Sequence, residues 1–351
     1  MVGAGIVGAS TAFHLSDRGV DVVVVDGSRR GAATPAGAGI ICPWPTARPD
    51  DDYVAQYVAG AHGIGPIVER LTELGETATS FRRVGSVVLA ETPDDLAEIE
   101  ARVARRAGGD PIVGDVHRIT GSDAREMFPP LRDDLPGIFI AGGARLDGRL
   151  FTAALLRARG LVPVTGDAEL VVDGDRVRGV VVGSETLSAD AVVVAGGAWT
   201  SRLLEPFGVP VDVEPQKGQI LHLRSPALAR IRPTGTWPSV LPPGPHYLRA
   251  FDDDRFVVGA SRETGSGYDV RPTVVGQREV LDAATAWAPG LADAEVIEFR
   301  VGLRPFAPNA NPMVGAVDGI GGLHVGTGMG PGGLTMGPHA GRRLADAIIA
   351  G

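Results

Sequence analysis

The sequence predicts a mixed α/β fold in which a Rossmann-type nucleotide-binding domain is interleaved with a strand-rich domain. Three stretches predict it: a glycine-rich fingerprint at residues 1–8 (MVGAGIVG), a strand, Gly-Gly turn and helix start at residues 189–204 (ADAVVVAGGAWTSRLL), and a strand, glycine loop and helix at residues 322–351. Strand-rich segments and further helices separate these nucleotide-facing pieces. Two interleaved domains explain this order better than two consecutive ones.

The fingerprint places Gly3, Gly5 and Gly8 in the spacing G-x-G-x-x-G. In this pattern the first glycine permits a tight turn, the second lets a phosphate approach the backbone, and the third lets the following helix pack on the sheet. The helix should cover residues 6–19 and stop at Gly19.

A β-branched run, VDVVVVD (residues 20–26), follows this helix and predicts a buried parallel strand. It ends at Asp26, whose carboxylate can accept both ribose hydroxyls of an adenosine. Only Met1 and Val2 remain of the strand that should precede Gly3, although this strand should be central in the sheet. We therefore expect that several more apolar residues at the N-terminus would make the protein more stable.

The other elements follow from hydrophobic periodicity and turn residues. Thr92 is a good N-cap for one of the expected helices. Helices are expected over residues 51–75, 93–107, 150–160 and 273–288. Strands are expected over residues 84–90, 217–224, 246–250 and 255–261, with a hairpin around residues 173–175.

Composition excludes several classes of protein. The net charge is −9, and no basic cluster indicates nucleic-acid binding. A single cysteine, Cys42, excludes internal disulfides and thiolate metal clusters, and the seven histidines show no metal-binding spacing. No apolar run reaches the roughly 18 residues of a transmembrane segment. We expect a cytoplasmic protein without a resident metal; its oligomeric state is open, and a homo-oligomer is one option.

Seven stretches, taken in order, resemble one family of enzymes. They are GAGIVGASTAFHL, AGAGII, AGGAW, PQKGQIL, HYLRAFDDDRFVVGAS, GLRPFAPNANPMVG and GLHVGTGMGPGGLTMGPHAGRRLA, and they span nearly the whole chain. The family is that of D-amino-acid oxidase and glycine/sarcosine oxidase, which are FAD-dependent oxidoreductases. The fingerprint alone is shared with many NAD enzymes, whereas the C-terminal block is much more specific. The resemblance implies that the fingerprint holds the ADP half of FAD.

The resemblance also implies the division of the chain. A discontinuous FAD-binding domain would comprise residues 1–45, 145–210 and 300–351. A substrate-binding domain would comprise residues 46–144 and 211–299.

Five parts of the chain are implied in FAD binding. The small residues of TPAGAGI (34–40) would lie along the pyrophosphate and one flavin face, and the C-terminal glycines would let the backbone approach the flavin ring. The last helix, starting near Leu334–Thr335, would aim its positive end at the N1/C2-carbonyl edge of the flavin. For Trp199, a place in the core is an equal alternative. The expected contacts are Gly3, Gly5, Ile6, Val7, Gly8, Asp26, Gly27, Ser28, Thr34, Ala38, Gly39, Ile40, Gly196, Gly197, Trp199, Gly330, Gly332, Gly333, Leu334 and Thr335.

The resemblance implies that FAD is bound noncovalently. Some members attach FAD to a cysteine just before the C-terminal proline block, where this chain has VGLRPF and no cysteine. Cys42 lies in a loop that matches the noncovalent members.

Two residues match the family's catalytic groups. Arg304 in GLRP matches the arginine that binds the substrate carboxylate, and Tyr247 in HYLRA matches the tyrosine that binds the same group. The alternatives are a surface salt bridge for Arg304 and a half-buried strand position for Tyr247. A substrate held in this way would point its Cα–H at flavin N5 for hydride transfer.

Further residues near these motifs carry weaker expectations. His246 should point away from the site because alternate strand residues face opposite ways. Lys217, the only lysine, should be a strand-entry residue at the domain junction. Val257 stands where sarcosine-oxidase-like members carry an oxygen-activating lysine. Candidate walls of the side-chain pocket are Trp44, Trp237, Phe251 and Arg262.

The predicted function is that of an FAD-dependent amino-acid oxidase or dehydrogenase acting on CH–NH₂ or CH–NH donors. It would oxidise a D-amino acid or small amino acid to the imino acid, which then hydrolyses to an oxo acid and ammonia. The alternatives are a glycine/sarcosine-type secondary amine oxidase, a 2-hydroxy-acid oxidoreductase and a noncatalytic flavin-binding protein. The expected partner is a small carboxylate-bearing amine; its identity, and oxygen or quinone as electron acceptor, stay open.

Overall fold

The N-terminal fingerprint folds into the expected turn and helix beside a parallel sheet. The computed structural model describes residues 1–48, 50–231, 233–308 and 311–351. Val2 forms parallel bridges to strands on both of its sides, so the short segment before Gly3 is central in the sheet, as expected. The order across the sheet is β8 (Val164–Thr165), β1 (Val25–Asp26), Val2, β12 (Val192–Val194), β19 (Leu323–Thr327) and β18 (Met313–Ala316).

The strand expected over residues 20–26 is much shorter than predicted. Only β1, Val25–Asp26, pairs as a strand, and Val23 is 48% exposed. The ammonium of Met1 donates to Val23 O at 2.7 Å. Residues before Val23 therefore have no neighbour in the central strand, and they run along the surface.

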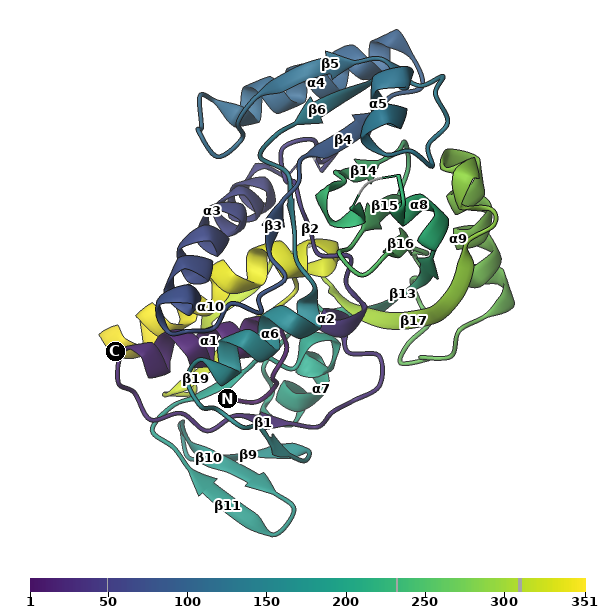
Figure 1. Cartoon of the computed structure of the whole chain (residues 1–351). Coiled ribbons are helices and arrows are strands. Elements are labelled where there is room, and N and C mark those ends of the chain that lie inside the picture. Colours follow the sequence, from purple (N-terminus) through teal and green to yellow (C-terminus); the bar gives the residue numbers. More distant parts are fainter. Residues whose placement is uncertain (49, 232, 309–310) are drawn as a thin grey trace.

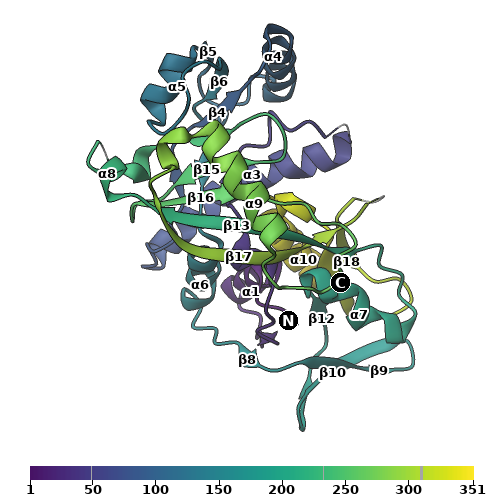
Figure 2. The same ribbon diagram turned by 90° about the vertical axis from the view of Figure 1, so that its right-hand side faces the viewer.

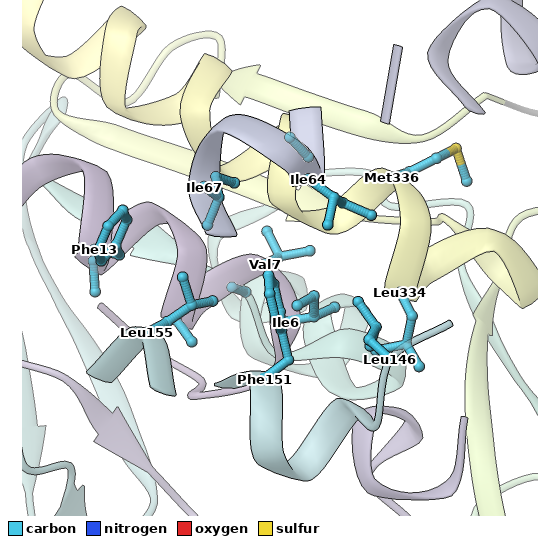
Figure 3. Close-up of a cluster of buried hydrophobic side chains, with 14 of the residues drawn as sticks. Ile6, Val7, Phe13, Ile64, Ile67, Leu146, Phe151, Leu155, Leu334 and Met336 are labelled. Carbon is cyan, nitrogen blue, oxygen red and sulfur yellow. The ribbon is translucent and has the colours of Figure 1, made fainter. Parts of the chain in front are cut away.

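Helices α1 (Ile6–Asp17) and α10 (Gly333–Ala350) pack against the parallel sheet, α3 (Asp51–Glu73) and α6 (Gly148–Arg157) pack against these two helices, and all four share one hydrophobic core. Helices α1 and α10 cross closely: a Cβ on Gly341 would lie 2.6 Å from Ser10 Cβ, so only glycine fits there. Figure 3 shows side chains of this core, among them Ile6, Val7, Phe13, Ile64, Ile67, Phe151, Leu155 and Leu334.

A second, larger sheet extends away from these helices (Figures 1 and 2). Its order is β17 (Glu295–Phe306), β13 (Glu214–Arg224), β16 (Arg255–Gly259), β15 (Tyr247–Ala250), β14 (Ser239–Leu241), β4 (Ser86–Leu89), β6 (Gly137–Ile140) and β5 (Val116–Ile119). Only the β14–β4 pair is parallel. The helices of this half are α4 (Pro93–Ala107), α5 (Gly121–Met127), α8 (Pro226–Ala229) and α9 (Val274–Trp287).

Short elements complete the fold. A small antiparallel sheet of β2 (Ile40–Ile41), β7 (Ala144–Arg145) and β3 (Arg82–Arg83) lies between the two larger ones. The hairpin expected around residues 173–175 joins β9 (Ala168–Asp173) to β10 (Arg176–Val182), and β11 (Glu185–Ser188) extends it. Two short helices, α2 (Ala33–Ala36) and α7 (Thr200–Leu204), follow nucleotide-facing turns.

Most expected helices occur where the sequence placed them. Helix α4 begins as predicted, because the Thr92 side chain accepts the Asp95 N–H at its first turn. The division into two domains stays a prediction: β17 runs across residue 300, and α3 packs in the core around α1 and α10. No helix formed by the described residues is long and apolar enough to cross a bilayer.

The N-terminal ammonium gives a testable prediction on stability. Burial lowers the pKa of the Met1 ammonium from 8.0 to about 6. Between pH 6 and 8 the unfolded chain therefore binds more protons than the folded one, so stability should rise with pH across this window. An extension of about three apolar residues should continue the strand beside β1 and move the ammonium away. We expect a higher Tm and the loss of this rise.

Thermal unfolding of both chains between pH 6 and 8 measures the effect. Burial lowers the pKa of His14 and of His222 to about 4, and these groups titrate equally in both proteins. The difference between the two pH profiles therefore isolates the ammonium. Identical profiles and equal melting temperatures would contradict the prediction.

Candidate active site

One cavity of about 1200 Å³ connects the nucleotide-facing turns with the large sheet. Small-molecule sites usually measure roughly 300–1,000 Å³, so this cavity has room for more than a small ligand. All the expected site residues line it except Gly8 and Ser28. A Cβ on Gly8 would lie 1.9 Å from Gly3 O, so Gly8 serves the packing of α1 against the turn.

Hydrogen bonds fix the fingerprint end of the cavity. Asp26 Oδ2 accepts the Ala4 N–H at 2.6 Å, and Asp26 Oδ1 accepts the Ser28 N–H at 2.7 Å. Thr34 Oγ1 accepts the Ile6 N–H at 3.0 Å and ties the next loop to the start of α1. These bonds explain how a carboxylate and a small-residue loop come together at the fingerprint.

Two helix N-termini open into the same cavity. The N-cap residues of α1 and α10 are Gly5 and Gly332, which have no side chain to cap the helix, and at α1 Thr34 Oγ1 accepts the first N–H. Uncapped N–H groups and the positive end of a helix form a favourable site for anions. Helix α10 begins at Gly333, one residue before the start that the sequence predicted.

An arginine that the sequence analysis did not single out, Arg249, holds the loop at residues 34–40 on the side away from the cavity. Arg249 is fully buried, and its guanidinium donates to Ala38 O and, at 2.9 Å, to Leu146 O. Gly39 beside it has φ +67°, and a Cβ there would lie 1.9 Å from Leu146 O. The sequence contains one indication of this role, because Arg249 is a charged residue inside the expected strand HYLRA.

Arg304 lies at the other end of the cavity, on β17. Its Nη1 donates to Ser261 O at 3.1 Å, to Lys217 O at 3.4 Å and to Gln216 Oε1 at 3.5 Å. Burial lowers the pKa of Arg304, and no carboxylate of a described residue lies within ion-pair distance of it. A Cβ on Gly218 would lie 2.5 Å from Arg304 Nη2, so this glycine makes room for the guanidinium.

Tyr247 begins β15 and faces the Arg304 end of the cavity. It pairs with Gly259 across the sheet, and its hydroxyl lies 2.6 Å from the position that a Gly259 Cβ would occupy. Burial raises the pKa of Tyr247 to about 12, although the nearby charge of Arg304 opposes this shift. The hydroxyl therefore keeps its proton at neutral pH and can donate a hydrogen bond.

Two expectations near these residues were wrong. His246 lines the cavity, because it belongs to the proline-rich loop before β15 and strand alternation does not apply to it. Its Nε2 lies 3.6 Å from Glu279 Oε1. Lys217 lies inside β13 and is buried, with Nζ 3.4 Å from Glu263 Oε2 and 3.6 Å from Asp269 Oδ2.

Of the four candidate pocket walls, only Arg262 lines the cavity. Trp44 and Trp237 are fully buried in separate core clusters, and Phe251 is buried beneath arginine side chains. Val257 is buried in the same small cluster as Phe251 and does not line the cavity. Sequence periodicity could not orient these aromatic residues. Among the described residues no group of His, Cys, Asp or Glu side chains could hold a metal ion.

The geometry agrees with comparisons to known proteins. A model of the family described as FAD dependent oxidoreductase matches residues 1–347. The chain belongs to this family. Oxidoreductase YurR of Bacillus subtilis (strain 168), named as uncharacterized, is 40% identical to this FAD-dependent oxidoreductase over 99% of this chain and 94% of the relative. Glycine oxidase of Pseudomonas putida is 28% identical over 99% of this chain and 93% of the relative.

Comparison with solved structures agrees with the assignment of this chain to the FAD-dependent oxidoreductases. The crystal structure of iminodiacetate oxidase from Chelativorans sp. BNC1 matches with a TM-score of 0.95 and 44% identity, covering 99% of this chain and 94% of that chain. The resemblance, the mixed α/β fold, FAD as cofactor and an oxidoreductase acting on the C–N bond of amino acids are thus confirmed. The two helix N-termini with glycine N-cap residues and the glycine-lined path between them fit a long, anionic dinucleotide.

Gly218 provides a test of the Arg304 position. Gly218→Ala should displace the guanidinium, because the new Cβ would lie within 2.7 Å of three of its atoms. A displacement of about 1 Å can cost about 100-fold in rate, so kcat/KM should fall by this order while FAD binding is retained. Gly63→Ala is the control, since its Cβ would meet nothing closer than 3.7 Å. Unchanged kinetics in Gly218→Ala would show that Arg304 need not be where the structure has it.

Proposed function

We propose that this FAD-dependent oxidoreductase oxidises a small amino acid whose carboxylate is bound by Arg304 and Tyr247. The observation that carries the proposal is the half-buried Arg304 guanidinium, which lines the cavity and has only neutral oxygens as described partners. A buried charge is costly unless an opposite charge and hydrogen bonds compensate it. A substrate carboxylate supplies both.

The two side chains have complementary tasks in this proposal. Arg304 presents a planar pair of N–H donors to the carboxylate, and the protonated Tyr247 hydroxyl adds a third donor from another strand. Three donors fix both the position and the angle of the carboxylate, and hence the direction of the adjacent Cα–H bond. Bound FAD supplies the acceptor for the hydride that leaves Cα.

The expected FAD contacts stay part of the proposal, supported by the residues that line the cavity. Asp26 and the α1 N-terminus would hold the adenosine and pyrophosphate, and the loop at residues 34–40 and the α10 N-terminus would hold the flavin. Gly8 and Ser28 would act indirectly, through packing and through the Asp26 bond.

Arg304 and Tyr247 could also bind the carboxylate of a 2-hydroxy acid. The names of the relatives favour an amine as the substrate. Relatives named glycine oxidase and iminodiacetate oxidase support a primary or secondary amine next to the carboxylate.

Arg304→Ala should abolish activity on carboxylate substrates while FAD stays bound. Loss of a buried charge-pair partner costs on the order of 3–5 kcal/mol, or about a hundred- to several-thousand-fold in kcat/KM. Arg304→Lys should recover only part of the activity, because an ammonium cannot form a planar pair of bonds. Anaerobic flavin reduction measures both variants. Near-normal kcat/KM for Arg304→Ala on the best amino-acid substrate would refute the assignment; an amine without a carboxylate is the control.

FAD should be released when the protein is denatured. Cys42 lines the cavity, but burial raises the pKa of its thiol to about 12, so the nucleophilic thiolate is scarce at neutral pH. Acid precipitation should therefore leave a colourless pellet and a yellow supernatant. A pellet that keeps the flavin absorbance would show a covalent link.

A further inference from the structure

We propose that Lys217 is a positioning residue for Arg304. Its ammonium lies behind the cavity and fixes the chain segment whose carbonyl groups orient the Arg304 guanidinium. This inference rests on the proposed function, because it concerns how the chain holds the group that binds the substrate carboxylate.

Lys217 is the only lysine of the chain, and it is 1% exposed. Its neighbours Gln216 and Gly218 line the cavity, whereas Lys217 does not. Successive side chains of a strand point to opposite faces, so the Lys217 side chain lies on the far face of β13. Any effect of this side chain on the reaction must therefore pass through other residues.

The Lys217 ammonium lies beside two carboxylates of the loop that follows β16. Its Nζ is 3.4 Å from Glu263 Oε2 and 3.6 Å from Asp269 Oδ2. Burial of Glu263 acts to raise the pKa of its carboxyl group. Hydrogen bonds from Gln219 and Ser261 and the charge of Lys217 outweigh burial, so this pKa lies below its ordinary value. The Glu263 carboxylate is thus charged at neutral pH and attracts the ammonium.

A buried ion pair of this kind is a poor source of stability. Removing two charges from water costs much of the free energy that their attraction returns, and a well-packed apolar side chain is often as stable. In some proteins a buried pair instead selects one arrangement of the chain. The arrangement selected here is that of residues 261–269 against β13.

The segment beside Lys217 contains the main acceptor of Arg304. Glu263 Oε1 accepts from Ser261 Oγ at 2.7 Å, and Ser261 O accepts from Arg304 Nη1 at 3.1 Å. The backbone adds a second link, because Lys217 O accepts the Glu263 N–H at 2.9 Å and also accepts from Arg304 Nη1, at 3.4 Å. Lys217, Glu263 and Ser261 thus form a continuous path to the guanidinium.

The third acceptor of Arg304 is held by the same segment. Arg304 Nη1 donates to Gln216 Oε1 at 3.5 Å, and Gln216 Nε2 donates to Thr264 Oγ1 at 3.1 Å. In the part of the chain that the structure describes, the hydrogen bonds of the Arg304 side chain all use Nη1. Nη2 and Nε are left for a carboxylate, and acceptors in residues 216–217 and 261–264 decide where these two groups point.

Loss of the ammonium should move this segment without unfolding the protein. The two carboxylates would then repel each other across the vacated space. The Glu263 and Asp269 side chains are 28% and 30% exposed, so water can solvate both charges once the segment shifts outward. Ser261 O would move with the segment and turn the guanidinium.

Lys217→Met tests the inference, because it removes the charge and keeps a side chain of similar length. Anaerobic flavin reduction by the best amino-acid substrate gives kcat/KM. Titration with propionate, an unreactive carboxylate, gives an affinity from the change in flavin absorbance. A displacement of about 1 Å can cost about 100-fold, so we expect both values to fall by about 10- to 100-fold. The affinity for FAD, measured by reconstitution of the apoprotein, should stay within about threefold of wild type, because Lys217 does not line the cavity.

Three further variants separate positioning from stability. Lys217→Arg retains the charge and should recover part of the loss. Glu263→Gln removes the partner carboxylate at nearly constant shape and should resemble Lys217→Met. Leu131→Ala leaves a void in the core of the large sheet, where Leu131 is buried away from the cavity. It should lower Tm while the affinity for propionate stays that of wild type.

A double variant tests whether Lys217 acts through Arg304. Adding Lys217→Met to Arg304→Ala should cause little further loss of kcat/KM, because no guanidinium is left to misplace. A general weakening of the fold would instead lower kcat/KM by the same factor in both backgrounds, and that result would overturn the inference.

The outcomes also distinguish this inference from the proposed function. If Arg304→Ala loses propionate affinity and kcat/KM while Lys217→Met keeps both, Lys217 is not a positioning residue and the proposed function stands. If Lys217→Met does not fold, Glu263→Gln decides by the same comparison. If Arg304→Ala itself keeps both values, the proposed function fails, and this inference fails with it.

Discussion

The antiparallel ladder between β13 and β17 is the interaction on which the site depends. It pairs Glu214–Arg224 with Glu295–Phe306 and carries Arg304 from the large sheet into the cavity. On its other side, Leu303 N–H donates to Gly31 O at 2.8 Å, so the same strand anchors the loop that leaves the fingerprint unit. The ladder therefore sets the distance between the fingerprint end and the Arg304 end of the cavity. Because backbone bonds along a whole strand form together, this distance is held more rigidly than side-chain contacts alone would hold it.

Two arginines, the buried Arg249 and the half-buried Arg255, hold the wall of the cavity through side-chain contacts. Arg249 and Arg255 place their guanidinium carbons 3.9 and 4.0 Å from the centre of the Phe251 ring. Arg255 has a carboxylate partner, Asp147 at 3.1 Å, whereas Arg249 is offset by backbone carbonyls, one of them that of Ala38. A buried cation that is satisfied by loop carbonyls fixes those carbonyls in place. The loop expected at the flavin is thus held by the protein on the side away from the cavity.

The sequence predicted elements better where local rules decide them. Thr92 caps α4 as expected, and the Gly-Gly turn after β12 and the glycine loop before α10 occur where the pattern placed them. The prediction failed where a tertiary neighbour decides. The strand through Val23 is short because the neighbouring strand begins at Met1, and His246 lines the cavity because its loop breaks the alternation of β15. Local periodicity predicts neither where the neighbouring strand begins nor where the loop containing His246 lies.

The two halves of the cavity also differ in how far the sequence predicts them: local sequence decides the dinucleotide half, and tertiary neighbours decide the substrate half. A dinucleotide is bound largely through backbone N–H groups and helix ends, which need close approach, and close approach demands glycine at fixed spacings that a sequence displays. A small substrate is bound by side chains on different strands, and their convergence depends on register. Arg304 reaches its place because Gly218, two residues from its cross-strand partner Gln216, leaves room for the guanidinium. The glycine spacings are visible in the sequence, whereas the position of Arg304 beside Gly218 is set only once β13 and β17 have paired.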